Sequence, residues 1–195
     1  AQYLRPDHIY ALLLTAALLE DLQSYELATE TYKLVPADHP AFHAAELGRA
    51  LGTFHRLIHD LPCRQLADTL EGFHITPGYL ASFDQVHAAL TGRTPRHRFD
   101  ADERHCIAFV QQRRALAGVL EQAKAAGVLQ LRPIHGDPKV NNVMLDSATG
   151  RAVALVDLDT VKPGLVHYDI GDCLRSGCNP AGEETRDLEA VVFDL

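Results

Sequence analysis

A short stretch of the chain carries polar residues whose types and spacing suit the transfer of a phosphoryl group. Asp137 and Asn142 lie close together in the sequence, and Asp157 follows at the end of a later apolar run. Phosphoryl transfer needs a carboxylate beside the acceptor hydroxyl and oxygen ligands for Mg²⁺, which prefers one or two carboxylates together with phosphates and waters. Asp137 is the predicted base, and Asn142 and Asp157 are the predicted ligands of the metal and its nucleotide.

Three neighbouring residues have predicted roles in the same site. Lys139, which follows Asp137 closely, would lie over the transferred phosphate and offset the charge that develops on its oxygens. His135 belongs to the catalytic group, and we expect it to hold the loop in shape rather than to carry protons. Asp159 fits either a further metal contact or a turn at the end of a strand, and the sequence leaves both open.

A β-hairpin is needed to bring these residues together. Residues 143–145 and 152–158 are short apolar runs, partly β-branched, and residues 146–151 between them are rich in turn formers. If Asn142 starts the first strand and Asp157 ends the second, the chain folds back so that both side chains reach one ion. The sequence therefore predicts a hairpin with a metal site at its open end.

Residues 41–61 predict a core helix that Pro62 ends. Its apolar residues follow the spacing of one buried stripe: Leu47, Ala50, Leu51, Phe54, Leu57, Ile58 and Leu61. His55 and His59 lie four residues apart on this helix, a spacing that can hold a metal. Because no glutamate follows His55 as in the HExxH pattern, we expect a solvated helix face instead.

The other elements are less regular. Residues 102–126 predict a second long helix, with Gly127 as a left-handed C-terminal cap. We expect loops around short helices in residues 63–99, with one helix near residues 79–90, and an irregular segment in residues 163–179. Residues 7–22 fit a helix or a buried strand, and residues 183–192 predict a helix.

The composition indicates a folded chain of about one domain. It has 195 residues, of which 47% are hydrophobic and 23% charged. The net charge of −8 opposes broad attraction to nucleic acid or to anionic membranes. The apolar run at residues 9–19 is shorter than the about 20 residues that a membrane span needs. The four cysteines form no CxxC pair, so we expect free thiols and a cytoplasmic protein.

The candidate residues belong to a longer pattern. Residues 135–144 read His-Gly-Asp-Pro-Lys-Val-Asn-Asn-Val-Met, and residues 156–165 read Val-Asp-Leu-Asp-Thr-Val-Lys-Pro-Gly-Leu. The spacing H-x-D-x-x-x-x-N, followed by a strand that ends in aspartate, is that of a kinase catalytic loop. Residues 134–177 resemble the aminoglycoside phosphotransferase-like family of small-molecule kinases, and their sequence most resembles its N-acetylhexosamine 1-kinase branch.

This resemblance implies an α+β fold, a protein-kinase-like C-terminal lobe that is mostly helical with a small catalytic β-hairpin. It implies ATP and Mg²⁺ as cofactors, and transfer of the γ-phosphate to a small-molecule hydroxyl, in that branch the anomeric hydroxyl of a sugar. It also implies that Asp169 ties the backbone of the catalytic loop. For Arg175 it leaves a substrate contact or an ion pair with Asp172, of which we expect the pair.

The glycine pattern departs from the family. No G-x-G-x-x-G loop is present, and no Walker pattern replaces it. We therefore expect the nucleotide lobe to be largely absent, with residues 1–30 a remnant of it or of the hinge. Residues 31–195 would be a helical catalytic lobe, incomplete at its C-terminal end and inactive alone. The alternatives are a catalytically silent lobe that serves as a binding or scaffolding module, and a kinase of another small alcohol such as an aminoglycoside, choline or homoserine. The oligomeric state is left open.

Overall fold

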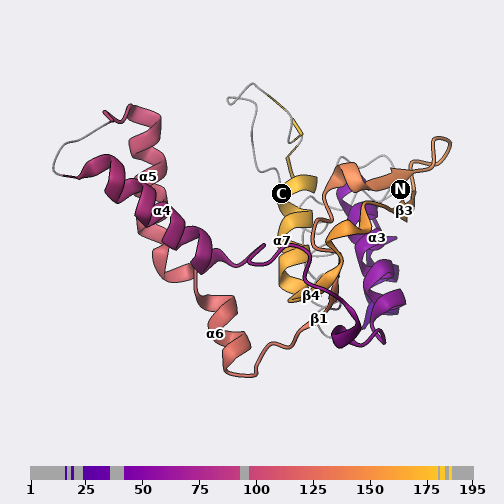
Figure 1. Ribbon diagram of the computed structural model, residues 1–195. Helices are drawn as coiled ribbons and strands as arrows, with labels where there is room; N and C mark the ends of the chain where they lie inside the picture. The colour runs from indigo at the N-terminus through magenta and orange to yellow at the C-terminus, as the bar shows by residue number, and fades with distance from the viewer. Residues whose placement is uncertain are drawn as a thin grey trace. The chain divides into compact units, whose positions relative to one another are not determined.

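The computed structural model describes residues 16, 19, 24–35, 42–92, 97–179, 181, 182 and 185 (Figure 1). The chain divides into two compact units. The first combines Ala1–Thr69 with Leu131–Leu195, and the second is Leu70–Gln130. Neither of these borders is predicted from the sequence. The candidate residues of the site all belong to the first unit.

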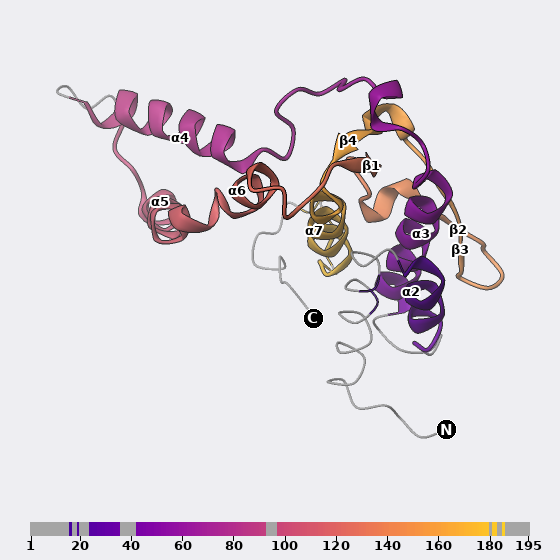
Figure 2. The same ribbon diagram turned by 90° about the horizontal axis from the view of Figure 1, so that it is seen from below.

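The first unit is built around helix α3 (Phe42–Ile58), which confirms the helix predicted for residues 41–61. Leu47 and Leu51 are buried and pack against Cys173 of helix α7 (Val166–Gly177). Three partly buried side chains of the hairpin region pack against the same cluster: Val140, Val143 and Leu155. Figure 2 shows helix α2 (Tyr25–Tyr32) and the hairpin lying against α3. The core of this unit therefore lies directly beneath the hairpin that carries the candidate site.

The last turns of α3 differ from the predicted stripe. Leu57 is 67% exposed, whereas His55 is only 2% exposed. The prediction that His55 lies on a solvated face is therefore wrong, while His59 is exposed as expected. The physical reason is that the buried face of α3 ends in a polar contact, a hydrogen bond from His55 to Asp169, rather than in an apolar one.

Two antiparallel strand pairs flank the candidate site. Strand β1 (Arg132–Ile134) pairs with β4 (Lys162–Gly164), and β2 (Val143–Leu145) pairs with β3 (Ala152–Leu155). In the β2–β3 hairpin Val143 lies opposite Leu155, and the register shifts between Met144 and Leu145. Asp146 closes the connection by accepting hydrogen bonds from Thr149 and Ala148. The predicted hairpin is thus confirmed, and the β1–β4 pair is an addition to it.

The prediction of an irregular segment in residues 163–179 is wrong, because most of these residues form α7. The buried face of α7 mixes apolar and polar side chains: Val166, Tyr168, Asp169, Asp172, Cys173 and Ser176. An apolar periodicity is hidden when polar residues occupy buried positions, and such positions require hydrogen-bond partners. The polar side chains on the buried face of α7 therefore indicate that this helix contacts polar groups of the site.

The second unit contains helices α4 (Thr76–Thr91), α5 (Ala101–Arg113) and α6 (Val119–Ala125). The helix expected near residues 79–90 is confirmed. The single helix expected over residues 102–126 is wrong, because the chain breaks after α5 and α6 begins only after Gly118. Glycine is a poor helix former, which favours the break. Gly127 has φ of 73°, the left-handed conformation expected of it.

Some expectations fall largely outside the described residues. Of residues 7–22 only Ala16 and Leu19 are described, both as helical. Of residues 183–192, where a helix is expected, only Thr185 is described, and it is not in a helix. No helix in the described part of the chain is long and apolar enough to cross a bilayer. The four cysteines, all in described segments, form no disulfide.

A buried carboxylate joins α3 to the hairpin. Glu46 accepts hydrogen bonds from the backbone N–H of Ala152 at 2.8 Å and from Arg49 at 2.6 Å, and Arg151 lies 3.2 Å away. Arg49 also donates to the carbonyl of Ala152. Burial raises the pKa of Glu46, but the hydrogen bonds and positive charges outweigh it and hold the pKa below its usual value of 4.5. Helix α3 thus binds both the N–H and the carbonyl of Ala152, the first residue of β3.

We expect Glu46→Gln to lower the free energy of unfolding at neutral pH by about 2 kcal/mol, because a buried ion pair loses one partner. The lowered pKa of Glu46 means that its contribution is complete above pH 4.5 and is lost as pH falls through the folded-state value. Urea denaturation from pH 7 to pH 3 should show the difference between variant and wild type shrinking below pH 4.5. A difference that stays constant across this range would contradict the role assigned to the carboxylate.

Candidate active site

The loop of residues 135–142 follows β1, and one buried aspartate binds its backbone. Asp169 of α7 is fully buried, and its carboxylate accepts the backbone N–H groups of His135 and Gly136, each at 2.8 Å. Ser176, further along α7, accepts the N–H of Val140 at 2.8 Å. The resemblance implied such a tie from Asp169. Helix α7 therefore sets the backbone of the loop at both of its ends.

A third donor reaches the same aspartate. His55 Nε2 of α3 lies 2.8 Å from Asp169 Oδ2, and the exposed fractions of the two side chains are 1% and 0%. A carboxylate buried this deeply must be hydrogen-bonded to be stable. Sequence reasoning missed His55 as part of the site. The signal was available in its position, because it follows Leu47 and Leu51 at helical spacing on the buried face of α3.

Gly136 allows the loop to approach the segment after β3. Its φ is 89°, a left-handed value that favours glycine, and a Cβ at this position would lie 2.5 Å from the carbonyl oxygen of Thr160. The hydroxyl of Thr160 donates to the carbonyl of His135 at 2.8 Å. The loop and this segment are therefore in direct backbone contact.

We expect Gly136→Ala to destabilise the first unit by at least about 3 kcal/mol, because the new Cβ adds a backbone clash to an unfavourable φ. Gly150→Ala is the matched control, since Gly150 also has positive φ, 68°, but its nearest neighbour for a Cβ is 3.5 Å away. Urea denaturation of both variants measures the difference. Equal losses of stability would show that the contact with Thr160 is not close.

His135 faces the interior of the site. Its side chain is fully buried, with Nε2 lying 3.0 Å from the carbonyl oxygen of Val156 and Nδ1 accepting the N–H of Asp137 at 3.3 Å. Its ring packs edge-on against Phe54 with centroids 5.3 Å apart. Both ring nitrogens contact backbone groups, so this side chain links the loop to the end of the hairpin.

The carboxylate of Asp137 lies at the edge of the loop and is 19% exposed. Lys139 Nζ donates to its Oδ2 at 2.8 Å, and the amide nitrogen of Asn142 lies 3.4 Å from the same oxygen. The Asn142 amide also donates to the carbonyl of Asp137 at 2.8 Å. Among the contacts described, both donors use Oδ2, which makes Oδ1 the oxygen suited to accept a proton from a hydroxyl.

Asn142 and Asp157 lie at the same end of the hairpin. The N–H of Val156 donates to the carbonyl of Asn142 at 2.8 Å, and Asp157 is the next residue. Asp157 is exposed and has φ of 66° in the left-handed region, after which a single 3₁₀ turn, η4 (Leu158–Thr160), leads to β4. Strand β3 ends at Leu155, so it is shorter than the predicted run of residues 152–158, and Asp157 turns the chain two residues beyond it.

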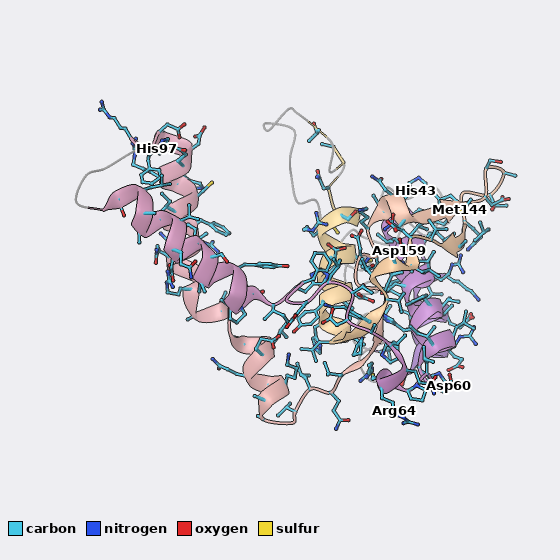
Figure 3. All side chains as sticks on the ribbon, viewed as in Figure 1. His43, Asp60, Arg64, His97, Met144 and Asp159 are labelled. Carbon is cyan, nitrogen blue, oxygen red and sulfur yellow. The ribbon has the colours of Figure 1, made fainter. Side chains whose placement is uncertain are left out.

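The described residues contain no group of three His, Cys, Asp or Glu side chains placed to hold a metal. Asp137, Asp157 and Asp159 therefore do not gather into a closed protein site. Asp159, which is labelled in Figure 3, is exposed. Its carbonyl accepts a hydrogen bond from the hydroxyl of Thr69 at 2.9 Å. What the fold does supply is one amide and one carboxylate at the open end of a hairpin, a set suited to a cation whose other ligands are phosphates and waters.

Arg175 pairs with Asp172 on α7, as expected. The guanidinium donates to Asp172 Oδ1 from Nε at 3.0 Å and from Nη2 at 2.6 Å. This is an i, i+3 contact along one helix, so it needs no other element to form.

A loop whose backbone is held by a buried aspartate, a carboxylate paired with lysine and asparagine, and a second aspartate just beyond a hairpin form the arrangement expected of a phosphotransferase of the kinase type. The comparison with known families agrees. The model of the phosphotransferase enzyme family, APH, matches residues 5–190. The chain belongs to this family, and with it to phosphotransferases of protein-kinase-like fold that act on small molecules.

Proposed function

We propose that the protein transfers the γ-phosphate of ATP, in a Mg²⁺-dependent reaction, to the hydroxyl of a small molecule, with Asp137 as the base. The observation that carries this proposal is the geometry around Asp137. Its carboxylate lies on a loop whose backbone is fixed by Asp169, and its Oδ2 is held by Lys139 and Asn142. A base that is held in one orientation acts without reorganisation when the hydroxyl arrives.

The roles of the other residues follow from their contacts. Oδ1 of Asp137 accepts the proton of the acceptor hydroxyl as its oxygen attacks phosphorus. Lys139 lies beside this carboxylate, and its positive charge, close to the transferred group, would stabilise the negative charge of the transition state. His135 keeps the loop and the hairpin end in register through its contacts with Val156 and Asp137.

Asn142 and Asp157 fit the nucleotide-bound metal. Because the amide nitrogen of Asn142 is committed to Asp137, its carbonyl oxygen is the atom that can face a cation. Asp157 offers an exposed carboxylate two positions beyond β3. When bound, Mg²⁺ would neutralise charge on the phosphates and bring them to the acceptor. Asp159 lies two residues after Asp157 in the sequence and is proposed as an outer contact only.

The proposed acceptor is a sugar, an N-acetylhexosamine that is phosphorylated at its anomeric hydroxyl. Support comes from the sequence of residues 135–144 and 156–165, which resembles the N-acetylhexosamine 1-kinase branch. Family membership alone does not distinguish acceptors, because one fold serves many substrates. Aminoglycosides, choline and homoserine are the competing acceptors in the same reaction class.

Coupled detection of ADP release tests this proposal. The intact enzyme is incubated with ATP, Mg²⁺ and one acceptor at a time: N-acetylglucosamine, N-acetylgalactosamine, an aminoglycoside, choline or homoserine. We expect release with an N-acetylhexosamine, none without acceptor above a slow hydrolysis, and none after EDTA. Release with choline or homoserine alone would replace the proposed acceptor, and release with no acceptor at all, together with unchanged melting on addition of ATP and Mg²⁺, would contradict the proposed activity.

A further inference from the structure

We infer that Asp68 and Thr69 are positioning residues of the metal site, which hold the segment after β3 so that Asp157 is presented to the cation. This inference rests on the proposed function, since it assigns a role toward Mg²⁺. The two residues come from the connection after α3, far in sequence from the 135–142 loop and from the hairpin. Neither belongs to the motif that the sequence analysis singled out.

The segment that carries Asp157 has little secondary structure of its own. Strand β3 ends at Leu155 and β4 begins at Lys162, and between them lie a left-handed residue and a single 3₁₀ turn. A non-glycine residue with positive φ costs of order 1 kcal/mol and persists only where its surroundings hold it. The position of Asp157 must therefore be fixed by contacts from other parts of the unit.

One set of contacts comes from the 135–142 loop. The hydroxyl of Thr160 donates to the carbonyl of His135, and Gly136 packs closely on the backbone of Thr160. These contacts hold the inner side of the segment. Neither of these contacts involves Asp159, which is exposed.

The second set comes from Asp68 and Thr69. The hydroxyl of Thr69 donates to the carbonyl of Asp159 at 2.9 Å. The ammonium of Lys162, whose side chain is only 4% exposed, donates to Asp68 Oδ1 at 2.9 Å. Two adjacent residues of one connection thus hold the segment at two points, one in the 3₁₀ turn and one at the start of β4.

The bond from Thr69 is suited to a positioning role rather than to stability. It is exposed, and an exposed hydrogen bond contributes little to folding, because water replaces it. Its carbonyl partner, however, lies two residues from Asp157, and a ligand displaced by about 1 Å can lower activity on the order of a hundredfold. Loss of this hydroxyl should therefore be seen in metal affinity and not in the melting temperature.

The test uses Thr69→Val, which keeps the shape of the side chain and removes its hydroxyl, and Thr69→Ser, which restores the donor. Thr91→Val is the matched control, because the Thr91 hydroxyl also donates to a backbone carbonyl at an exposed position, in α4. Mn²⁺ affinity of the intact enzyme with a non-hydrolysable ATP analogue is measured by electron paramagnetic resonance, and the half-saturating Mg²⁺ concentration by ADP release.

We expect Thr69→Val to weaken Mn²⁺ binding and to raise the half-saturating Mg²⁺ concentration by about tenfold. The rate at saturating Mg²⁺ should recover most of its wild-type value, Thr69→Ser should restore the affinity, and Thr91→Val should match wild type. Asp68→Asn, which weakens the hold on Lys162, should change metal affinity in the same direction.

Asp157→Ala distinguishes a failure of the positioning role from a failure of the metal assignment in the proposed function. If Asp157→Ala abolishes Mn²⁺ binding while Thr69→Val and Asp68→Asn leave it unchanged, the positioning role is wrong and the proposed function stands. If Asp157→Ala leaves Mn²⁺ binding unchanged, the metal assignment in the proposed function fails, and the positioning role falls with it. A Thr69→Val enzyme that loses rate without losing metal affinity would also overturn the inference.

Discussion

Replacing Asp137 with asparagine is expected to lower kcat by about a thousandfold, within the range that a positioned general base contributes. The amide has nearly the same size as the carboxylate but accepts a proton far less readily. The KM for the acceptor should change much less, because the amide can still hydrogen-bond to a hydroxyl. The fold should remain, since Asp137 is partly exposed and its backbone is held by contacts of His135 and Asn142.

Asp60→Asn is the control for this substitution. Asp60 is an exposed aspartate just beyond α3 and is labelled in Figure 3. Both variants should melt within a few degrees of wild type, and steady-state kinetics with coupled ADP release should separate them. An Asp137→Asn enzyme with a kcat near that of wild type would remove Asp137 from the role of base.

Replacing Asp157 with alanine is expected to lower kcat/KM by at least about a hundredfold. The half-saturating Mg²⁺ concentration should rise so far that activity no longer saturates with Mg²⁺. The reason is the loss of a charged ligand. Asn142→Ala removes a neutral ligand and should have a smaller, though still large, effect. Asp159→Ala should be the mildest of the three, because the described contact of Asp159 uses its backbone carbonyl and not its side chain.

Activity as a function of Mg²⁺ concentration at fixed ATP orders these three variants. The exposure of Asp157 and Asp159 makes their two substitutions tolerable for the fold. Asn142 is buried and donates to the Asp137 backbone, so thermal melting is needed most for Asn142→Ala. An Asp157→Ala enzyme with unchanged Mg²⁺ dependence, or an Asp159→Ala enzyme that is the most impaired, would show that the metal ligands are assigned wrongly.

The elements that were predicted correctly from the sequence are those specified by residues near to one another in the chain. The apolar spacing of Leu47 and Leu51 identified α3, and the turn formers between two apolar runs identified the β2–β3 hairpin. Gly127 was recognised because a left-handed cap has few alternatives to glycine. Each of these features is specified by residues near to one another in the chain.

The parts that sequence reasoning missed depend on contacts between distant residues. Helix α7 looks irregular because Asp169 and Ser176 occupy buried positions, and their partners lie in the 135–142 loop. His55 looked like a surface residue for the same reason, since its partner is Asp169. A polar residue at a buried position can be recognised only when its partner is known. The division into two units likewise depends on contacts between residues that are distant in the sequence. The break before α6, in contrast, has a local signal in Gly118.

Phosphorus-31 nuclear magnetic resonance of the reaction mixture tests the central proposal most directly. The intact enzyme, ATP, Mg²⁺ and an N-acetylhexosamine should give ADP together with a phosphate monoester signal that couples to the anomeric proton of the sugar. The same mixture with the Asp137→Asn enzyme should give only ATP over the same time. Formation of inorganic phosphate alone by the wild-type enzyme, or the same phosphate ester at an undiminished rate with Asp137→Asn, would contradict a hydroxyl-directed phosphotransferase with Asp137 as its base.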